Sequence, residues 1–548
     1  MIAQTVRRPA LALALLGLVA SACTGETGAP ARTGGPVAKD APLPGAKAQP
    51  YEVLKVVLNN AGTGTLDVVN ANHTKATVYA QMWSNFLVYV DPESLQPRPG
   101  LAKEFSVNAT GNEYTFKLRD DVRFHDGTPF NAEAVKFNFE RIAAAKVGAS
   151  YDALGGKKYR STAVVDPYTV RVTFTDPYWT FYDQAALRLW FDSPAAVAKH
   201  GKDYGTKVVV GTGPYRMVDW VPNDHVFLER NDDYKWGPSV HKIQGPGYAR
   251  RIEIRGIVEG ATRRATLESG QADVVMLEET DVPDIQKDAR FKVDLQPKAG
   301  TVRQLQINQK KFPFNDIVVR RAVAYAIDRE ALVKAPRYSG IAQVALGIQG
   351  LKNMGGKWAE ELKSVQYGFD PARARKLLDD AGYRLVGNVR EKDGQKLQID
   401  FIFPTGALSE VQPIQAMLAD IGIQAKLTEL QTAKWFDSFQ KGEMSITIGS
   451  SSGVGIDMFV NAFLTNGTEN WWGVADPALD AILVKVDGAA DPKARFDASV
   501  EAQKRIIAQA YGLPLLDVFY PFGMKKSVFD VYYPPFSWPS FYQTWLAQ

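Results

Sequence analysis

The sequence predicts a mixed α/β fold, in which short strands and amphipathic helices follow one another along the chain. Segments 114–119 and 169–174 alternate apolar and polar residues, which is typical of half-buried strands. Segments 131–145 and 370–382 combine capping residues with apolar positions at helical spacing. About 500 residues follow a low-complexity N-terminal stretch, more than one hydrophobic core usually organises, so we expect two or three domains.

A strand, a turn and a helix are predicted in the first half of the chain. The pair Asp126-Gly127 predicts a tight turn, and Asn131 is a suitable N-cap for the helix that follows it. His125 is interpreted as a hydrogen-bonded turn residue rather than as a ligand of a metal or solute. The apolar faces consist of Tyr114, Phe116 and Leu118 in the strand and of Val135, Phe139 and Ile142 in the helix.

Four further elements are predicted downstream. Residues 169–174 form a strand, residues 314–333 one packed helix, residues 370–382 a capped helix, and residues 389–403 two strands around an Asp-Gly turn. In the long helix, Arg320 and its neighbour Arg321 are expected on a solvated or ion-paired face. The positions that carry these predictions are Val170, Val172 and Phe174; Val319, Val323 and Ile327; Asp370, Pro371, Leu377, Leu378 and Gly382; and Asp393 and Gly394.

The N-terminal residues have the layout of an export signal. Two arginines precede residues 10–22, a short apolar region that ends in small residues, and Cys23, the only cysteine of the chain, follows directly. This arrangement resembles a bacterial lipoprotein signal, in which the cysteine is lipidated on sulfur and becomes the mature N-terminus. The resemblance implies a signal peptide over residues 1–23. Residues 24–50 are rich in Gly, Pro and Ala and are expected to be a disordered tether.

Two alternatives stay open for this N-terminus. One is an ordinary secretory signal with an incidental cysteine; the other is a twin-arginine signal at Arg7-Arg8, which Pro9 and Ala10 fit poorly. An exported body with a single cysteine has no internal disulfide, so its stability must come from burial. The net charge of +4 over 548 residues, without a basic run that contains aromatics, argues against nucleic-acid binding.

Catalytic and metal-binding motifs are incomplete. "GSSSG" at 449–453 matches the G-x-S-x-G nucleophile motif, but there the histidine follows the serine, and the last histidine of this chain is His241. "SFQK" at 438–441 lacks a companion Lys-Thr-Gly. The chain has no H-E-x-x-H, no C-x-x-C and no phosphate-binding loop, and its five histidines are scattered. We expect no catalysis, cofactor or metal site; an exported enzyme with an unrecognised site is kept as a third hypothesis.

Several segments together resemble one family, the dipeptide, oligopeptide and nickel branch (family 5) of the ABC-transporter solute-binding proteins. The most specific are "RFHDGTPFNAEAVKFNFERI" and "VVGTGPYR", at residues 123–142 and 209–216. Other similar segments are "DPESLQPRPGLAKEFSV", "LERNDDYKWG", "GQADVV", "INQKKFPFNDIVVRRAVAYAIDREALV" and "DPARARKLLDDAGY". These segments span residues 91–383, and weaker similarity continues to the C-terminus.

The resemblance implies the bilobal fold of the large peptide-binding type of periplasmic binding proteins, with two lobes plus an extra inserted domain. It also implies a solute held between the lobes, hinge closure over that solute, and delivery to the permease and ATPase subunits of an ABC importer. We expect a monomer, anchored by lipid to the cell membrane in the periplasmic space or on the outer face of the plasma membrane. The implied boundaries are 51–75, 206–305 and 507–548 for lobe I, 76–205 for the inserted domain and 306–506 for lobe II.

The solute is the least determined feature. Peptide-binding members hold the ligand's α-amine with an aspartate four residues before a proline, in a stretch of the form D-x-x-[DE]-P. In the equivalent stretch here, "GSSSGVGIDMF", Ser452 takes the aspartate's place and Ile456 the proline's, while Asp457 lies just beyond. A hydroxyl cannot neutralise a buried ammonium. Either Asp457 substitutes, or the ligand lacks a free amine; Ser452 and Gly453 are candidate ligand contacts in both cases.

Further candidate ligand-binding residues are Trp471, Trp472, Trp190 and Arg188. Core packing is the alternative for each tryptophan, and a surface position is the alternative for Arg188, whose guanidinium would otherwise grip a ligand carboxylate. A nickel chelate is disfavoured because the second half of the chain has no histidine. The first hypothesis is therefore a receptor for short peptides or peptide-like solutes. The second is a receptor for a non-peptide such as a sugar derivative, an opine-like conjugate or another amphipathic compound.

Overall fold

The computed structural model describes most of the chain beyond the N-terminal region. The described residues are 48–59, 64–70, 73–92, 94, 96–146, 148–298, 300–350, 359–450, 459–467, 469–535 and 538–547. Cys23, Ser452, Gly453 and Asp457 lie outside them.

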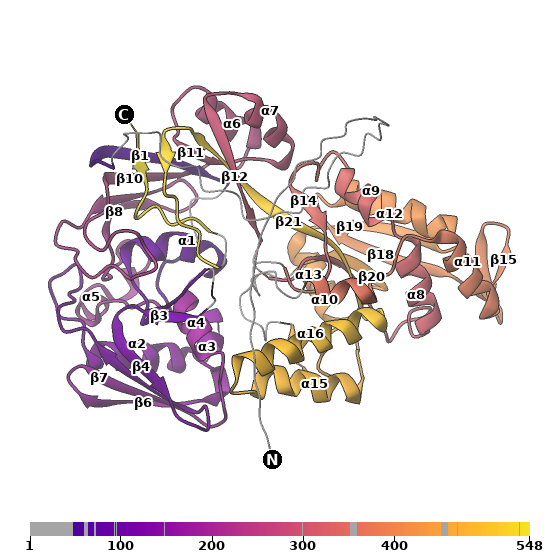
Figure 1. Ribbon diagram of the computed structural model, residues 1–548, viewed down its shortest axis with the longest axis horizontal. Helices are drawn as coiled ribbons and strands as arrows, with labels where there is room; N and C mark the ends of the chain where they lie inside the picture. The colour runs from indigo at the N-terminus through magenta and orange to yellow at the C-terminus, as the bar shows by residue number, and fades with distance from the viewer. Residues whose placement is uncertain are drawn as a thin grey trace, which may run out of the picture. The chain divides into compact units, whose positions relative to one another are not determined.

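One twelve-stranded mixed sheet organises the described residues (Figure 1). Its order is β19-β18-β20-β13-β21-β11-β1-β10-β9-β8, and β12 and β14 also pair with β21. Its strands are β1 (Tyr51–Leu58), β8 (Tyr215–Val221), β9 (His225–Arg230), β10 (Ala249–Gly256), β11 (Val274–Met276), β12 (Phe291–Pro297), β13 (Arg303–Ile307), β14 (Ala342–Val344), β18 (Gln398–Pro404), β19 (Gln424–Leu430), β20 (Ile446–Gly449) and β21 (Gly512–Lys525).

The long strand β21 belongs to both halves of this sheet. Its first residues pair with β13, with Gly512 opposite Gln306, and its last residues pair with β11 and β12, with Phe522 opposite Met276. In Figure 1 it runs as a yellow strand between the two groups of elements. Most of its side chains are buried, so this strand ties the two halves of the sheet together.

Smaller sheets and helices pack around the large sheet. The remaining strands are β2 (Val88–Val90), β3 (Pro97–Pro99), β4 (Ala102–Val107), β5 (Glu113–Leu118), β6 (Tyr159–Asp166), β7 (Thr169–Phe174), β15 (Arg384–Val386), β16 (Val389–Lys392), β17 (Gln395–Lys396), β22 (Val528–Phe529) and β23 (Trp545–Leu546). The α-helices are α1 (His73–Trp83), α2 (Ala132–Ala145), α3 (Ala149–Ala153), α4 (Phe181–Arg188), α5 (Pro194–His200), α6 (Gly260–Glu268), α7 (Val282–Lys287), α8 (Ile317–Ala326), α9 (Arg329–Lys334), α10 (Ala359–Leu362), α11 (Pro371–Asp380), α12 (Leu408–Asp420), α13 (Thr432–Gln440), α14 (Val460–Phe463), α15 (Pro477–Gly488) and α16 (Pro492–Ala508).

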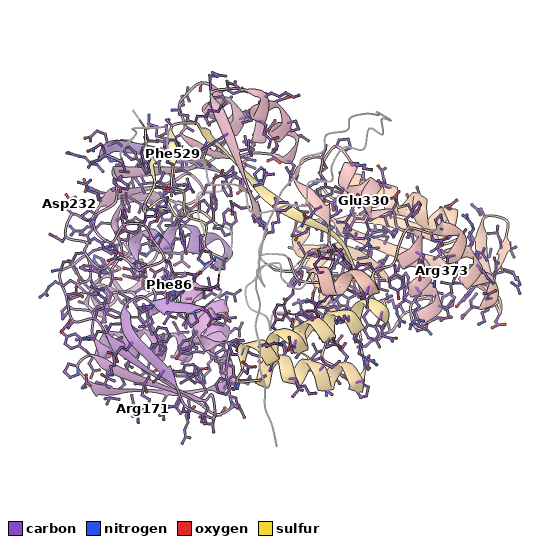
Figure 2. The ribbon with its side chains drawn as sticks, in the orientation of Figure 1. Phe86, Arg171, Asp232, Glu330, Arg373 and Phe529 are labelled. Carbon is purple, nitrogen blue, oxygen red and sulfur yellow. The ribbon has the colours of Figure 1, made fainter. Side chains whose placement is uncertain are left out.

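Two large hydrophobic clusters form the main cores. The first joins β1 and β10 of the large sheet to the four-stranded sheet β4-β5-β7-β6 and to helices α1, α2 and α4; Phe86, labelled in Figure 2, is one of its buried residues. The second lies between β13, β18 and β20 and helices α8, α11 and α12. Arg373, also labelled in Figure 2, is on the exposed side of α11, with its guanidinium 4.3 Å from the ring centre of Tyr325. These clusters supply the burial that a chain with one cysteine needs.

Most of the local predictions are confirmed. The predicted apolar faces of β5, β7 and α2 are buried, and Asn131 caps α2 by accepting a hydrogen bond from the amide of Ala134. Asp370 caps α11 in the same way, although Leu377 of that helix is only half-buried. The hairpin around Asp393 forms from β16 and β17, whereas β18 joins the large sheet instead.

The helix predicted over residues 314–333 is wrong in two respects. It divides into α8 and α9, because Asp328 leaves the helical conformation and accepts a hydrogen bond from the amide of Ala331 as a new N-cap. Arg320 is also buried rather than solvated: it donates hydrogen bonds to the carbonyl oxygens of Phe314 and Gln509. Those carbonyls need donors, and an arginine supplies several at once.

The turn interpretation of His125 is confirmed. Its Nε2 lies 3.0 Å from the carbonyl oxygen of Gly213, and burial lowers the pKa of the imidazole to about 4. Gly213 is needed because a Cβ at that position would lie 2.4 Å from the backbone of Trp83. The sequence motif that most resembles the family therefore packs one backbone segment tightly against another.

Candidate functional site

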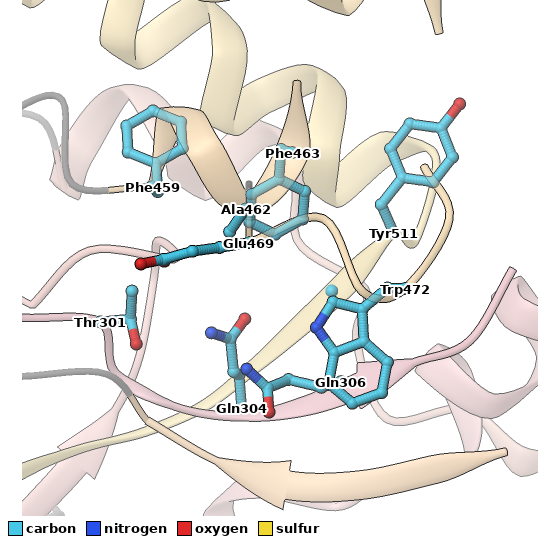
Figure 3. A pocket seen from close by; sticks show the side chains of 10 residues that line it. Thr301, Gln304, Gln306, Phe459, Ala462, Phe463, Glu469, Trp472 and Tyr511 are labelled. Carbon is cyan, nitrogen blue, oxygen red and sulfur yellow. The ribbon is translucent and has the colours of Figure 1, made fainter. Parts of the chain in front are cut away.

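A small pocket with a cavity volume of about 20 Å³, partly open to solvent, lies beside β13 and the start of β21 (Figure 3). Polar amides, aromatic rings and one carboxylate share its wall. Its lining residues are Thr301, Gln304, Gln306, Phe459, Ala462, Phe463, Glu469, Trp472, Tyr511 and Gly512. Such a mixture of apolar walls and a few polar groups is typical of small-molecule sites.

Two glutamines on β13 bring hydrogen-bonding groups to the pocket. Gln304 and Gln306 are two positions apart on one strand, so their side chains leave the same face of the sheet. Both side-chain carbonyl oxygens are buried and have no hydrogen-bond partner among the described residues. Neighbouring glycines make room for them: a Cβ at Gly449 would lie 2.7 Å from Oε1 of Gln306, and one at Gly512 would lie 3.0 Å from Oε1 of Gln304. These oxygens are therefore acceptors without a donor at the wall of the pocket.

A short loop before α15 holds Glu469 and Trp472. Asn470 fixes this loop, because its side-chain amide donates to the carbonyl oxygens of Leu464 and Val474 at 3.0 and 2.6 Å, and its oxygen accepts from the amide of Val474 at 3.0 Å. Figure 3 shows the Glu469 side chain extending across the pocket, near Phe459 and Thr301. The loop therefore presents this carboxylate in a defined position.

Aromatic residues support the pocket from behind. The Trp472 ring meets the ring of Phe439 edge-on, with centroids 4.4 Å apart, and Trp471 packs on the same Phe439 ring at 4.8 Å. Beside Trp472 in Figure 3, Tyr511 donates its hydroxyl to Asp476, the N-cap of α15, at 3.1 Å. Edge-to-face ring pairs of this kind contribute stabilisation beyond that of burial, so they hold the Trp472 ring in place at the pocket.

The carboxylate of Glu469 has charged neighbours from distant parts of the chain. Partial burial raises the pKa of Glu469, and the negative charge of Asp152 on α3 raises it further. Arg188, in the last turn of α4, opposes this shift, but its effect is smaller than that of Asp152. The pKa of Asp152 is itself raised by burial and lowered by Arg188. In the described parts of the chain, neither carboxylate forms a salt bridge.

The structure separates the sequence-predicted residues. Trp472 lines the pocket, and Trp471 packs behind it. Arg188 lies near Glu469 and Asp152, whereas Trp190 is fully buried in the first core and does not line the pocket. The candidates Ser452, Gly453 and Asp457 lie outside the described residues, so their roles stay predictions.

Sequence reasoning missed Glu469, Gln304, Gln306 and Tyr511. A signal did exist for the glutamines, since "QLQ" places two amides on one face of an otherwise apolar strand. Glu469 is one exposed acid among many, and its neighbour Asp152 is more than 300 positions away in the sequence.

Two further properties concern only the described residues. They contain no group of three or more His, Cys, Asp or Glu side chains that could hold a metal ion. None of the described helices is long and apolar enough to cross a membrane.

The family follows from a comparison with known proteins. Residues 96–473 match the description "Bacterial extracellular solute-binding proteins, family 5 Middle". The chain belongs to this family. The predicted resemblance is therefore confirmed, and the family's members are solute-binding receptors that function with ABC importers.

Individual relatives agree with this assignment. The glutathione-binding protein GsiB of Escherichia coli (strain K12) is 30% identical over 390 residues, or 69% of this chain and 70% of GsiB. NikA from Brucella suis, solved with Fe(III)-EDTA, is 26% identical with a TM-score of 0.77, over 88% of this chain and 97% of NikA. DppA from Helicobacter pylori, solved with the peptide STSA, is 22% identical with a TM-score of 0.72, over 91% of this chain and 99% of DppA. The predicted fold class is thus confirmed.

Proposed function

We propose that this family 5 protein is a lipid-anchored receptor that captures short peptides or peptide-like solutes and delivers them to an ABC importer. The observation that carries the proposal is the pocket at β13, where two buried amide oxygens without partners and one carboxylate stand among aromatic rings. Backbone and amine N–H groups of a peptide match these acceptors, and the rings match apolar side chains. DppA with a bound peptide and GsiB, named for glutathione, are consistent with this class of solute.

The proposed arrangement has two lobes and an inserted domain. Lobe I comprises residues 51–75, 206–305 and 507–548, the inserted domain residues 76–205, and lobe II residues 306–506. Support comes from the two large cores and from β21, which pairs with strands on both sides. In this arrangement Glu469 belongs to lobe II, and its charged neighbours Asp152 and Arg188 belong to the inserted domain.

The receptor acts without chemistry on its solute. We propose a monomer that hands the closed, loaded form to the permease, with ATP hydrolysis occurring in the importer's own subunits. Cys23 would carry the lipid and residues 24–50 the tether, which keeps the binding domains close to the membrane outside the cytoplasm.

Native mass spectrometry tests the solute class. The purified protein is exposed to a pool of random tri- to pentapeptides and, separately, to a cell extract. Retained masses that match intact peptides, in a one-to-one ratio and unchanged on prolonged incubation, are the expected result. Cleaved or modified peptides would instead indicate an enzyme.

Membrane fractionation tests the anchor. A Cys23→Ala variant should leave the membrane fraction, because acyl chains contribute about 0.8 kcal/mol per buried CH₂ and the variant has none. The same distribution for the variant and the parent protein would exclude lipid attachment at Cys23.

A second candidate is the same receptor role for a non-peptide solute. NikA is solved with Fe(III)-EDTA, and the family resemblance predicts Ser452 at the position where peptide-binding members carry the amine-binding aspartate. Retention of a non-peptide mass from the cell extract, with no peptide bound, would favour this candidate.

A further inference from the structure

Glu469 lies outside the D-x-x-[DE]-P stretch in which the family resemblance places the amine-binding acid. Its carboxylate nevertheless lines the pocket. We propose that Glu469, together with the side-chain oxygens of Gln304 and Gln306, receives the terminal ammonium of the solute. The inference rests on the proposed function, since it assigns the partner of a peptide's free amine. It places that partner outside the stretch where sequence alignment would seek it.

The first argument is the set of unfilled acceptors. The side-chain oxygens of Gln304 and Gln306 are buried without a partner, and Gln304 as a whole residue is only 3% exposed. A buried acceptor left without a donor costs roughly 1–3 kcal/mol. A protein that keeps two of them beside one pocket is therefore set up to receive N–H donors, and an ammonium brings three.

The second argument is the sign of the local charge. The negative charge of Asp152 raises the pKa of Glu469, and this effect exceeds the opposing effect of Arg188. The described residues supply no salt bridge to either carboxylate. A solute that brings a positive charge would relieve this repulsion, whereas a neutral or acidic end would not.

The third argument is the fixed geometry. Asn470, next to Glu469 in the sequence, holds the loop through four hydrogen bonds. Phe459, Phe463 and Trp472 form the apolar part of the same pocket wall. An apolar wall beside a charge pair strengthens the attraction between the charges, so a carboxylate in this position favours a solute with an amine.

The experiment compares five proteins with two ligand pools. Full-length protein in detergent, as the parent chain and as the Glu469→Gln, Asp457→Asn and Asp487→Asn variants, is titrated with a pool of tripeptides and with the same pool acetylated at the amine. Asp487→Asn is the matched control: it removes one negative charge from the same half of the chain, at an acid paired with Lys158 rather than at the pocket. Isothermal calorimetry measures affinity, and native mass spectrometry identifies what is retained.

The expected result has a definite pattern. The parent and both aspartate variants bind the free-amine pool at least 10-fold more tightly than the acetylated pool. Glu469→Gln loses about 10- to 100-fold in affinity for the free-amine pool only, which corresponds to a charge-assisted hydrogen bond. A fifth protein, Gln306→Met, should lose a few-fold, because it keeps the side-chain length but removes the acceptor.

Each contrary result has a separate meaning. If the parent protein discriminates against acetylation but Glu469→Gln does so equally, the inference is wrong and peptide binding stands. If Asp457→Asn alone abolishes the discrimination, the amine partner is Asp457 and the inference is again wrong. If the parent protein binds neither pool, the proposed peptide function itself fails, and an ammonium site for peptides fails with it.

Discussion

Two clusters in this protein contain the same groups, one arginine and two carboxylates. They differ in whether salt bridges join the arginine to the carboxylates. In the closed cluster, Arg141 lies between Asp67 and Asp192, with one guanidinium nitrogen 2.7 Å from a carboxylate oxygen of each. Asp192 is fully buried, and burial raises its pKa to about 7 against the opposing effect of Arg141. In the open cluster, formed by Asp152, Arg188 and Glu469, no described salt bridge reaches either acid.

The difference separates a structural from a binding arrangement. The closed cluster joins α2 to two loop segments inside the first core, and every charge faces an opposite one at short range. The open cluster gathers its members from segments far apart in the chain, at a pocket, and neither of its acids forms a salt bridge with a described residue. Two clusters of the same composition can therefore have different roles. What distinguishes them is whether the protein's own residues pair each carboxylate with a cation.

The largest expected effect is on the closed cluster. Arg141→Met should lower the free energy of unfolding by about 3–5 kcal/mol, because it leaves the buried Asp192 without its partner. Arg188→Met, the matched change in the open cluster, should lower it by no more than about 1 kcal/mol, since the Arg188 side chain is half-exposed. Urea unfolding followed by circular dichroism measures both. Equal losses for the two variants would remove the distinction between the clusters.

The next effect is a gain in stability at the open cluster. The folded-state pKa of Glu469 is raised, so its charged form costs stability above its ordinary pKa, and this cost disappears as the pH falls below that value. Glu469→Gln should therefore raise the melting temperature at pH 7 by about 1 °C and have no effect near pH 4. Thermal unfolding without ligand at the two pH values checks this. A destabilised variant at pH 7 would indicate that Glu469 already has a stabilising partner.

A smaller effect is expected where glycine makes room for the acceptors. Gly449→Ala would place a Cβ 2.7 Å from Oε1 of Gln306 and force that amide to turn. Affinity for a free-amine tripeptide should fall a few-fold with little change in melting temperature. Calorimetry gives the affinity, and Gly488→Ala, where a Cβ meets nothing within 4 Å, is the control. An unchanged affinity would mean that Gln306 does not contact the solute.

The smallest effect concerns an ion pair between α15 and the segment before β6. Lys158 and Asp487 lie 3.3 Å apart with side chains that are 37% and 40% exposed. Such pairs contribute about 0–1 kcal/mol, so Lys158→Ala should change neither the unfolding free energy nor the solute affinity by more than that. A larger change in affinity, measured by calorimetry, would show that this exposed ion pair contributes to solute binding, unlike the closed cluster.

The sequence predicts individual helices and strands, but it does not predict the pocket. Alternation and capping residues identify β5, β7, α2 and α11, because these patterns depend on neighbours within a few positions. The break between α8 and α9 and the burial of Arg320 depend on carbonyl groups supplied by other segments, such as that of Gln509. The pairing of Gln306 with Gly512 joins strands about 200 positions apart. No local pattern encodes such a pairing, nor the position of Glu469 relative to Asp152.

The most direct test is the pH dependence of affinity for one free-amine tripeptide, measured by calorimetry for the parent protein and for Glu469→Gln. An ionised Glu469 is needed to hold the ammonium, and its pKa is raised. The parent's affinity should therefore fall as the pH is lowered, beginning at a higher pH than an ordinary glutamate with a pKa of about 4.3 would require. The variant's affinity should be weaker at pH 7 and nearly constant, so that the two curves converge at low pH. Curves that stay parallel from pH 8 to pH 4 would contradict a carboxylate-held amine at this pocket.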